Sequence, residues 1–262
     1  MSLLEGKVAV VTGGAGSGIG HGISHVLAKR GAHVAIFEID IDSAEEVRQR
    51  IKTEGGSATV VRADVSRPDN VRRAIDMVVD EREHLDILVN NAGIGLIRPV
   101  AEASEEEFDH LVSIDLRGMW LCCKYAIPHM RRQKQGSIVN IASVHSRATQ
   151  PQFGLYAAIK AGVAGLSRGI AVQYGPDGIR ANTVSPGLVD GKQTRQIVAQ
   201  VSNDVQGYLD DFVRSDQALP QLIQPEDIGN LVAFLASDDA RMITGAEIPV
   251  DAGMWVQLAS RR

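Results

Sequence analysis

A tyrosine and a lysine four residues apart, Tyr156 and Lys160, follow a strand-like segment that ends at Ser143. Residues at this spacing share one face of a helix, so the two side chains are expected to point the same way. A phenol has an ordinary pKa of about 10, and a neighbouring ammonium favours its phenolate, which makes it useful as an acid or base. The Ser143 hydroxyl could hydrogen-bond the same substrate oxygen. Taken alone, the pair is also compatible with two residues that merely decorate a helix.

A glycine-rich loop, residues 12–20, connects the first expected strand to the first expected helix. Glycines at such a place let the backbone turn tightly and approach a pyrophosphate, whose charge suits a helix N-terminus. An isolated glycine loop could serve turn geometry alone, but its position between strand and helix argues against that alternative. We therefore predict a dinucleotide site to which the loop contributes Gly14, Ser17, Gly18, Ile19 and Gly20.

An acidic residue, Glu38, ends the second expected strand about twenty residues beyond the loop. A carboxylate there accepts both ribose hydroxyls and repels a 2′-phosphate. No arginine or lysine immediately follows Glu38 to neutralise such a phosphate. The pattern predicts NAD(H) rather than NADP(H) as cofactor; without the glycine loop, Glu38 would read as a solvated charge at a strand end.

Short apolar runs alternate with amphipathic helical segments along the whole chain. Such runs, with little alternation, indicate strands buried on both faces of a parallel sheet. We predict a single α/β domain over residues 1–262, a Rossmann-type doubly wound parallel sheet in a three-layer α/β/α arrangement. Two helix starts are expected, at Ser104-Glu-Glu-Glu107 and at Pro225-Glu-Asp227. The least regular part, residues 190–221, is a candidate substrate lid. The expected strands are 7–12, 33–37, 58–62, 86–90, 137–142, 179–184 and 246–250.

The composition is that of a soluble globular protein, with 44% apolar and 23% charged residues in 262. A net charge of -5 gives no support for nucleic-acid binding. No long uncharged apolar run suits a membrane span, and the first residues lack the features of a signal peptide, so a cytoplasmic location is expected. The adjacent Cys122 and Cys123 are expected to pack as small apolar residues. No metal site is predicted.

Several short motifs occur in an order that resembles the classical short-chain dehydrogenase/reductase family over almost the whole chain. Each motif is modest by itself, and turn chemistry alone could explain the Asn90-Asn91 and Pro186-Gly187 pairs. Their joint order and spacing are highly specific. The matching pieces are the glycine loop, Asp64-Val65, Asn90 to Gly93, Ser143, Tyr156 with Lys160, Asn182 through Gly187, and Thr244 to Asp251.

The resemblance implies a role for each matching residue. Tyr156 would be the acid/base, Lys160 would lower its pKa and bind the nicotinamide ribose, and Ser143 would orient the substrate oxygen. The cofactor would perform the hydride chemistry while the protein supplies position and charge. The implied cofactor contacts are Asp64 and Val65 at the adenine, Asn91, Ala92 and Gly93 along the groove, and Pro186, Gly187 and Val189 at the nicotinamide end.

Three positions depart from the family pattern. Four residues separate Gly13 from Gly18 where three are usual, so Gly14 is expected to take the first-glycine role. Asp115 stands where the family has a catalytic asparagine, so it is counted with the catalytic residues. An ionised carboxylate cannot donate a hydrogen bond, and its charge would stabilise protonated Lys160. Gly191 replaces a threonine that contacts the carboxamide; Thr194 lies near, and the glycine could act as a hinge.

These features favour an NAD-dependent dehydrogenase that acts on a secondary alcohol or its ketone. The expected pocket, residues 94–98, 144–153 and 190–221, offers His145, Arg147, Gln150 and Gln152. Each of these alone could be a solvated loop residue, but their clustering beside Ser143 favours a polyol, sugar or hydroxy acid over a steroid. Two alternatives remain: an NADPH-dependent carbonyl or 3-ketoacyl reductase, and an NAD(H)-binding sensor protein with impaired catalysis. The resemblance also implies a homotetramer, and the apolar ending Met254 to Leu258 is consistent with a buried interface or with cover for its own domain.

Overall fold

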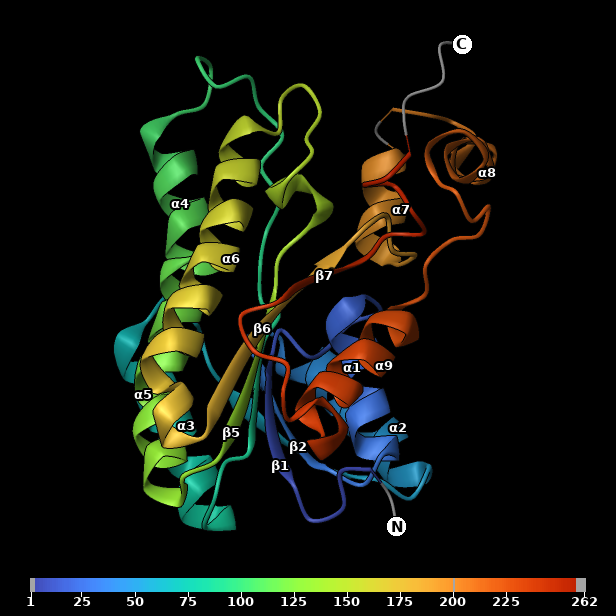
Figure 1. The fold of residues 1–262 in the computed structure, drawn as a ribbon. Helices are drawn as coiled ribbons and strands as arrows, with labels where there is room; N and C mark the ends of the chain where they lie inside the picture. The colour runs from blue at the N-terminus through green and yellow to red at the C-terminus, as the bar shows by residue number, and fades with distance from the viewer. Residues whose placement is uncertain (1–2, 200, 258–262) are drawn as a thin grey trace.

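A seven-stranded parallel sheet forms the middle layer of a three-layer α/β/α domain in the computed structural model, which describes residues 3–199 and 201–257 (Figure 1). The strand order is β3-β2-β1-β4-β5-β6-β7, so the chain reverses its direction of winding between β1 and β4. This confirms the predicted doubly wound fold. The strands are β1 Val8–Thr12, β2 His33–Glu38, β3 Ser57–Arg62, β4 Ile87–Asn90, β5 Gly136–Ile141, β6 Ile179–Pro186 and β7 Glu247–Val250.

The central strands are buried along their whole length because helices cover both faces of the sheet. Every residue of β1, β4 and β5 is buried, which explains their unbroken apolar character in the sequence. The predicted strand bounds agree with the observed ones to within two residues. The largest difference is in β6, which continues to Pro186 because Ser185 and Pro186 pair with Pro249 and Val250 of β7.

Two groups of helices pack against the sheet, one on each face, and each group closes its own apolar core. The helices on one face are α1 Ile19–Lys29, α2 Ile41–Thr53 and α9 Pro225–Ala236. Those on the other face are α3 Pro68–Arg82, α4 Glu105–Asp115, α5 Arg117–Gln133 and α6 Gly154–Tyr174. Both predicted helix starts are confirmed. The Ser104 hydroxyl accepts from the Glu107 amide at 3.2 Å while the Glu107 carboxylate accepts from the Ser104 amide at 3.0 Å, and α9 begins at Pro225.

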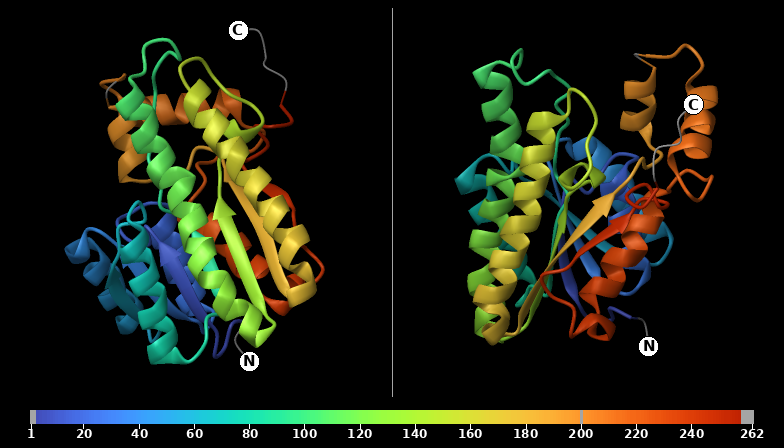
Figure 2. Two further views of the ribbon diagram at one scale, coloured as in Figure 1. Left: turned by 90° about the vertical axis from the view of Figure 1, so that its left-hand side faces the viewer. Right: turned by 45° about the horizontal axis from the view of Figure 1, so that its top comes forward.

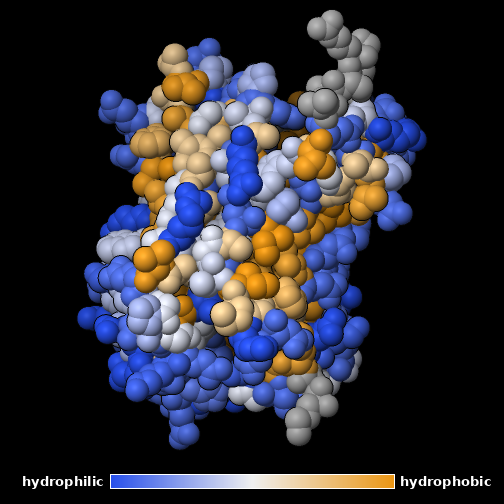
Figure 3. All heavy atoms as spheres, viewed as in Figure 1, coloured by the Kyte–Doolittle hydropathy of each residue, from blue (hydrophilic) through white to orange (hydrophobic). Residues whose placement is uncertain are grey.

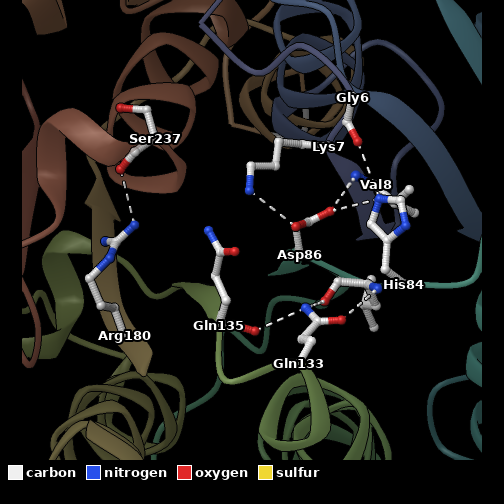
Figure 4. A network of polar contacts seen from close by, with 10 residues as sticks. Gly6, Lys7, Val8, His84, Asp86, Gln133, Gln135, Arg180 and Ser237 are labelled. Carbon is white, nitrogen blue, oxygen red and sulfur yellow. Dashed lines mark hydrogen bonds and ion pairs between the residues drawn. The ribbon is translucent and has the colours of Figure 1, made fainter. Parts of the chain in front are cut away.

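A buried carboxylate, Asp86, fastens the edge of the sheet at which the strands begin (Figure 4). It accepts a hydrogen bond from the Val8 amide at 2.9 Å, and it lies 3.2 Å from both Lys7 Nζ and His84 Nε2. These contacts join the starts of β1 and β4. The candidate site residues lie at the opposite edge, where the parallel strands end.

The segment between β6 and α9 lies beyond this carboxyl edge of the sheet (Figure 2). It contains α7 Lys192–Val198 and α8 Val205–Asp216, and it spans most of the predicted lid; Gln200 lies outside the described residues. Elsewhere in the chain, the helical segment 154–177 is long and apolar enough to resemble a membrane span. That segment is not uncharged, since it contains Lys160 and Arg168, and α6 within it packs against the sheet as a core helix.

Candidate active site

Tyr156 and Lys160 lie in the first two turns of α6, and the structure confirms that they share a face. The Lys160 ammonium lies 5.4 Å from the centre of the Tyr156 ring. It is buried, with 4% of the residue exposed, and its Nζ donates to the carbonyl of Ile141 at 3.5 Å. Because Ile141 ends β5, the lysine reaches back from the helix to the carboxyl edge of the sheet.

Asp115, the last residue of α4, is the direct partner of this lysine. Its Oδ2 lies 2.9 Å from Lys160 Nζ, and its side chain is fully buried. Its Oδ1 accepts from the Ile94 amide at 2.7 Å, so the loop after β4 also depends on this carboxylate. Gly93 makes room for the pair, since a Cβ there would lie 2.9 Å from Asp115 Oδ2.

The charges around Lys160 favour its ammonium form. Burial opposes that charge, but a Tyr156 phenolate and the Asp115 carboxylate outweigh the effect and raise the pKa of Lys160 above its ordinary value. The lysine is therefore a buried positive charge at neutral pH. It stands between the carboxylate and the phenol.

Ser143 follows β5 with extended backbone, and its hydroxyl accepts from the His145 amide at 3.2 Å. The next residues form the one-turn helix η1, Val144–Ser146. The His145 ring stacks on Phe153 with 4.4 Å between centres and meets the Tyr156 ring edge-on at 5.7 Å. Burial lowers the pKa of His145, so its ring is neutral at neutral pH. These three rings form an aromatic cluster close to Ser143.

The glycine loop makes its tight turn at Gly13, where φ is +61°, and not at Gly14. A side chain is excluded at several positions of the loop. A Cβ on Gly13 would lie 2.9 Å from Ala92 Cα, and one on Gly20 would lie 1.9 Å from the Gly13 oxygen. Gly14 is needed for packing, because a Cβ there would lie 2.7 Å from Ser24 Oγ. The left-handed backbone of the loop lies at Gly13 and Gly16, and the first-glycine role of Gly14 stays a prediction.

Side chains of Asn91 and Thr12 hold the glycine loop against the segment after β4 by hydrogen bonds. The Thr12 hydroxyl accepts from the amides of Asn91 at 3.0 Å and Ala92 at 3.1 Å. The Asn91 side chain donates to the carbonyls of Thr12 at 3.1 Å and Gly13 at 2.8 Å. Asn91 therefore fixes the backbone of the loop at Thr12 and Gly13.

The outer side of the loop has the character of a pyrophosphate site. Cβ atoms built on Gly16 and Gly18 meet nothing within 4 Å, so the backbone there can be approached closely. The following helix α1 has no acidic residue in its first turn, and no side chain of the described residues caps its start. Its free amides therefore suit a negatively charged group, and the residues present fit a dinucleotide.

Glu38 ends β2 at the same edge of the sheet, and its carboxylate accepts from the Ile39 amide at 2.9 Å. Sequence reasoning missed a basic residue beside it. Arg62, the last residue of β3, pairs in register with Glu38, and its guanidinium donates to the Ile39 carbonyl at 3.2 Å. Only the pairing of β2 with β3 reveals this neighbour, because the two residues are distant in the sequence.

The remaining predicted cofactor residues also lie at the carboxyl edge. The Asp64 carboxylate accepts from the Ser66 amide at 2.9 Å, and the Val65 side chain is buried against Gly118. At the other end of the groove, the Gly187 amide donates to Val250 at 2.9 Å, directly after Pro186. Val189 is also buried.

Gly191 brings the start of the 190–221 segment against the glycine loop. A Cβ there would lie 3.0 Å from the Ser17 oxygen, and the Lys192 amide donates to Ser17 Oγ at 3.3 Å. The Thr194 hydroxyl donates to the Val189 carbonyl at 2.7 Å. Thr194 thus stabilises the turn into α7, and a side chain at Gly191 would crowd the glycine loop.

The two adjacent cysteines are buried in the face of α5 that packs on the sheet. Burial raises the pKa of both thiols, so neither is a thiolate at neutral pH. Asn90 donates to Cys123 Sγ at 3.3 Å and to Asn140 Oδ1 at 2.8 Å. The predicted packing role of the cysteines is confirmed.

Comparison with known proteins covers nearly the whole chain. A family model described as enoyl-(acyl carrier protein) reductase matches residues 14–255. The chain is 39% identical to the cis-4-hydroxycyclohexanecarboxylate dehydrogenase of Sinomonas cyclohexanicum, over 94% of this chain and 96% of that protein. It is 36% identical to the 3-oxoacyl-(acyl-carrier-protein) reductase FabG of Staphylococcus epidermidis, over 95% and 99% of the two chains. A structure described as a "putative short-chain dehydrogenase/reductase" from Burkholderia xenovorans superposes with a TM-score of 0.94 at 35% identity, covering 98% of this chain and all of that one.

Proposed function

Because the chain belongs to the classical short-chain dehydrogenase/reductase family and is an oxidoreductase of that family, we propose that it interconverts a secondary alcohol and its ketone with NAD(H). The observation that carries the proposal is the buried Lys160 ammonium beside the ring of Tyr156. A fixed positive charge at this place favours the phenolate that must remove a hydroxyl proton.

In alcohol oxidation, Tyr156 accepts the proton of the substrate hydroxyl, and in ketone reduction it returns a proton to the oxygen. Ser143 donates a hydrogen bond to that same oxygen and so orients the reacting carbon. Lys160 supplies the positive charge, and Asp115 holds the lysine at 2.9 Å. The nicotinamide ring, when bound, supplies the acceptor or donor of the hydride.

Most of the residues that would hold the cofactor come at or directly after the carboxyl ends of the strands. The glycine loop and the start of α1 suit the pyrophosphate, and Glu38 suits the adenosine ribose. Asp64 and Val65 would contact the adenine, and Asn91 to Gly93 would line the groove. Lys160 and the segment Pro186 to Val189 would meet the nicotinamide end.

A second candidate is an NADPH-dependent carbonyl or 3-ketoacyl reductase. Arg62 beside Glu38 favours it, since a guanidinium can pair with a 2′-phosphate. The 36% identity to a FabG reductase points the same way. Glu38 still opposes a phosphate at this position, and for that reason NAD(H) remains our first choice.

For the substrate we propose a polar hydroxylated compound such as a polyol, sugar or hydroxy acid. The similarity to a dehydrogenase of a hydroxycyclohexanecarboxylate is consistent with a hydroxy acid. The rings of His145 and Phe153 would face its apolar side, and Gln150 and Gln152 lie in the adjoining exposed loop. Residues 190–221 would form the lid, whose first turn rests on Ser17.

We further propose that the protein is a cytoplasmic homotetramer. The edge of the sheet at α9 and β7 carries a band of apolar side chains (Figure 3). Among the exposed apolar residues are Phe234 on α9, Trp120 on α5 and Val172 on α6. A second copy could cover these faces. The sequence expectation about the apolar ending applies here only in part, because Leu258 lies outside the described residues.

An alcohol and ketone panel tests the proposal. Purified protein is given NAD⁺ or NADP⁺ with secondary alcohols, or NADH or NADPH with the ketones, and reduced cofactor is followed by its absorbance. We expect turnover with polar secondary alcohols and a higher kcat/KM for NAD⁺. A higher value for NADP⁺ would favour the reductase. NADH binding without turnover of any compound would favour the sensor.

A further inference from the structure

The turn that carries Ser143 is fastened from the last strand of the sheet. Glu247 on β7 has only 6% of its side chain exposed, although β7 is an edge strand. One carboxylate oxygen accepts from the hydroxyls of Ser146 and, at 3.0 Å, Ser185. The other accepts from Arg147 Nε at 3.0 Å. Two of these three donors belong to the turn that follows Ser143.

The same turn is held a second time by the C-terminal part of the chain. The indole of Trp255 donates to the Val144 carbonyl at 2.8 Å. The Arg147 guanidinium lies over the Trp255 ring at 4.9 Å, so it is placed between the indole and Glu247. The Trp255 backbone is fixed in turn, because its amide donates to the buried Asp251 carboxylate at 2.8 Å.

We propose that Glu247 is a positioning residue that, with Arg147 and Trp255, fixes the backbone turn presenting the Ser143 hydroxyl. As far as catalysis is concerned, this inference rests on the proposed function. Ser143 has only one contact to its own hydroxyl among those the described residues make, the His145 amide at 3.2 Å. Its orientation therefore follows the backbone of residues 144–147. Side chains of that turn also pack against α6 through His145 and Tyr156, but the hydrogen bonds that hold it from outside come from Glu247 and Trp255.

The geometry explains why a carboxylate is needed at this place. Three donors from two segments converge on Glu247, and a carboxylate has room for all of them. A glutamine offers one acceptor oxygen and no charge, so it cannot accept from Arg147 and from both hydroxyls at once, and it cannot form an ion pair. The turn would lose its ion pair while the fold, which depends on the buried sheet, remains. Small displacements of an orienting group reduce turnover strongly.

The test compares Glu247→Gln and Trp255→Phe with a matched control, Asp86→Asn. Asp86 is also a buried carboxylate with a cationic partner, but it lies at the opposite edge of the sheet (Figure 4). Hydrogen exchange measured by mass spectrometry reports the turn directly. We expect exchange in peptides covering residues 143–149 to become about tenfold faster in both test variants and to stay unchanged in the control.

Turnover gives the second readout. We expect kcat to fall about tenfold or more in Glu247→Gln, with NADH affinity unchanged. In a Ser143→Ala background the same substitution should lower kcat less than about twofold, because the hydroxyl that Glu247 positions is absent. Unchanged hydrogen exchange in the turn overturns the inference. Faster exchange also overturns it if kcat is unchanged, or if Glu247→Gln lowers kcat equally with and without the Ser143 hydroxyl. If the unmodified protein turns over no compound, the proposed function fails, and exchange alone decides whether Glu247 holds the turn.

Discussion

Replacing Asp115 by asparagine removes the negative charge next to Lys160 without changing the size of the side chain. The Ile94 amide keeps its acceptor, since the amide oxygen of asparagine can replace Oδ1. The lysine loses its ion partner at 2.9 Å. What remains around Tyr156 is a less negative environment, and we expect the phenolate to form at lower pH.

The distances allow a magnitude. The Lys160 ammonium is 2.9 Å from Asp115 Oδ2 and 5.4 Å from the centre of the Tyr156 ring, so carboxylate and ring lie no more than about 8 Å apart. Two unit charges at about 8 Å interact by about 2 kcal/mol at an effective dielectric constant near 20. After partial screening, we expect the acid limb of kcat/KM for alcohol oxidation to move down by about one pH unit.

The assay is a pH series of kcat/KM for one alcohol with NAD⁺, for the unmodified protein and Asp115→Asn. The alkaline limb should move to lower pH as well, because the carboxylate is one of the charges that raise the pKa of Lys160. Asp86→Asn removes a buried carboxylate far from the site and should leave both limbs in place. An acid limb that stays where it was, or that moves up, would refute the electrostatic coupling.

Three further perturbations test other parts of the structure. Glu38→Ala should raise kcat/KM for NADP⁺ about fivefold through the neighbouring guanidinium, and the added Arg62→Ala substitution should cancel the gain. Gly20→Ala places a methyl group 1.9 Å from a backbone oxygen and should lower both the melting temperature and the affinity for NADH. Gly18→Ala, with open space around the new methyl group, should lower only the affinity for NADH, measured by fluorescence titration. Burial, and less strongly a nearby arginine, lower the pKa of His33 to about 4, so between pH 6.5 and 4 the unfolded chain binds a proton that the folded chain does not. As the pH falls through this window, the free energy of unfolding should decrease by about 1 kcal/mol after allowance for half exposure of the ring. In urea titrations at several pH values, His33→Gln should not show this decrease.

The fold could be predicted because its signals are local. The central strands β1, β4 and β5 are apolar runs that helices cover on both sides, and the starts of α4 and α9 are patterns within four residues. The same holds for the spacing of Tyr156 and Lys160, which requires only a helix. The extra glycine has no such local signal: both Gly13 and Gly14 exclude a side chain, and the positive φ angles at Gly13 and Gly16 are visible only in the structure.

The features missed from the sequence are pairings between distant segments. Arg62 meets Glu38 only because β2 and β3 pair in register. Glu247 reaches the turn after Ser143 only because β7 lies next to β6 in the sheet. Periodicity and motifs carry no information about such contacts, since the order of strands decides them. Asp115 is an intermediate case: the sequence shows a carboxylate at this position, but only the structure shows its 2.9 Å ion pair with Lys160.

The most direct measurement of the central claim is isotope transfer from substrate to cofactor. A secondary alcohol deuterated at the carbinol carbon is incubated with NAD⁺, and the reduced cofactor is analysed by mass spectrometry. Deuterium should appear in the reduced cofactor with the unmodified protein. Tyr156→Phe should bind NADH with unchanged affinity but transfer no deuterium. Transfer at an undiminished rate by this variant, or bound cofactor that never acquires deuterium from any alcohol in the panel, would contradict the account.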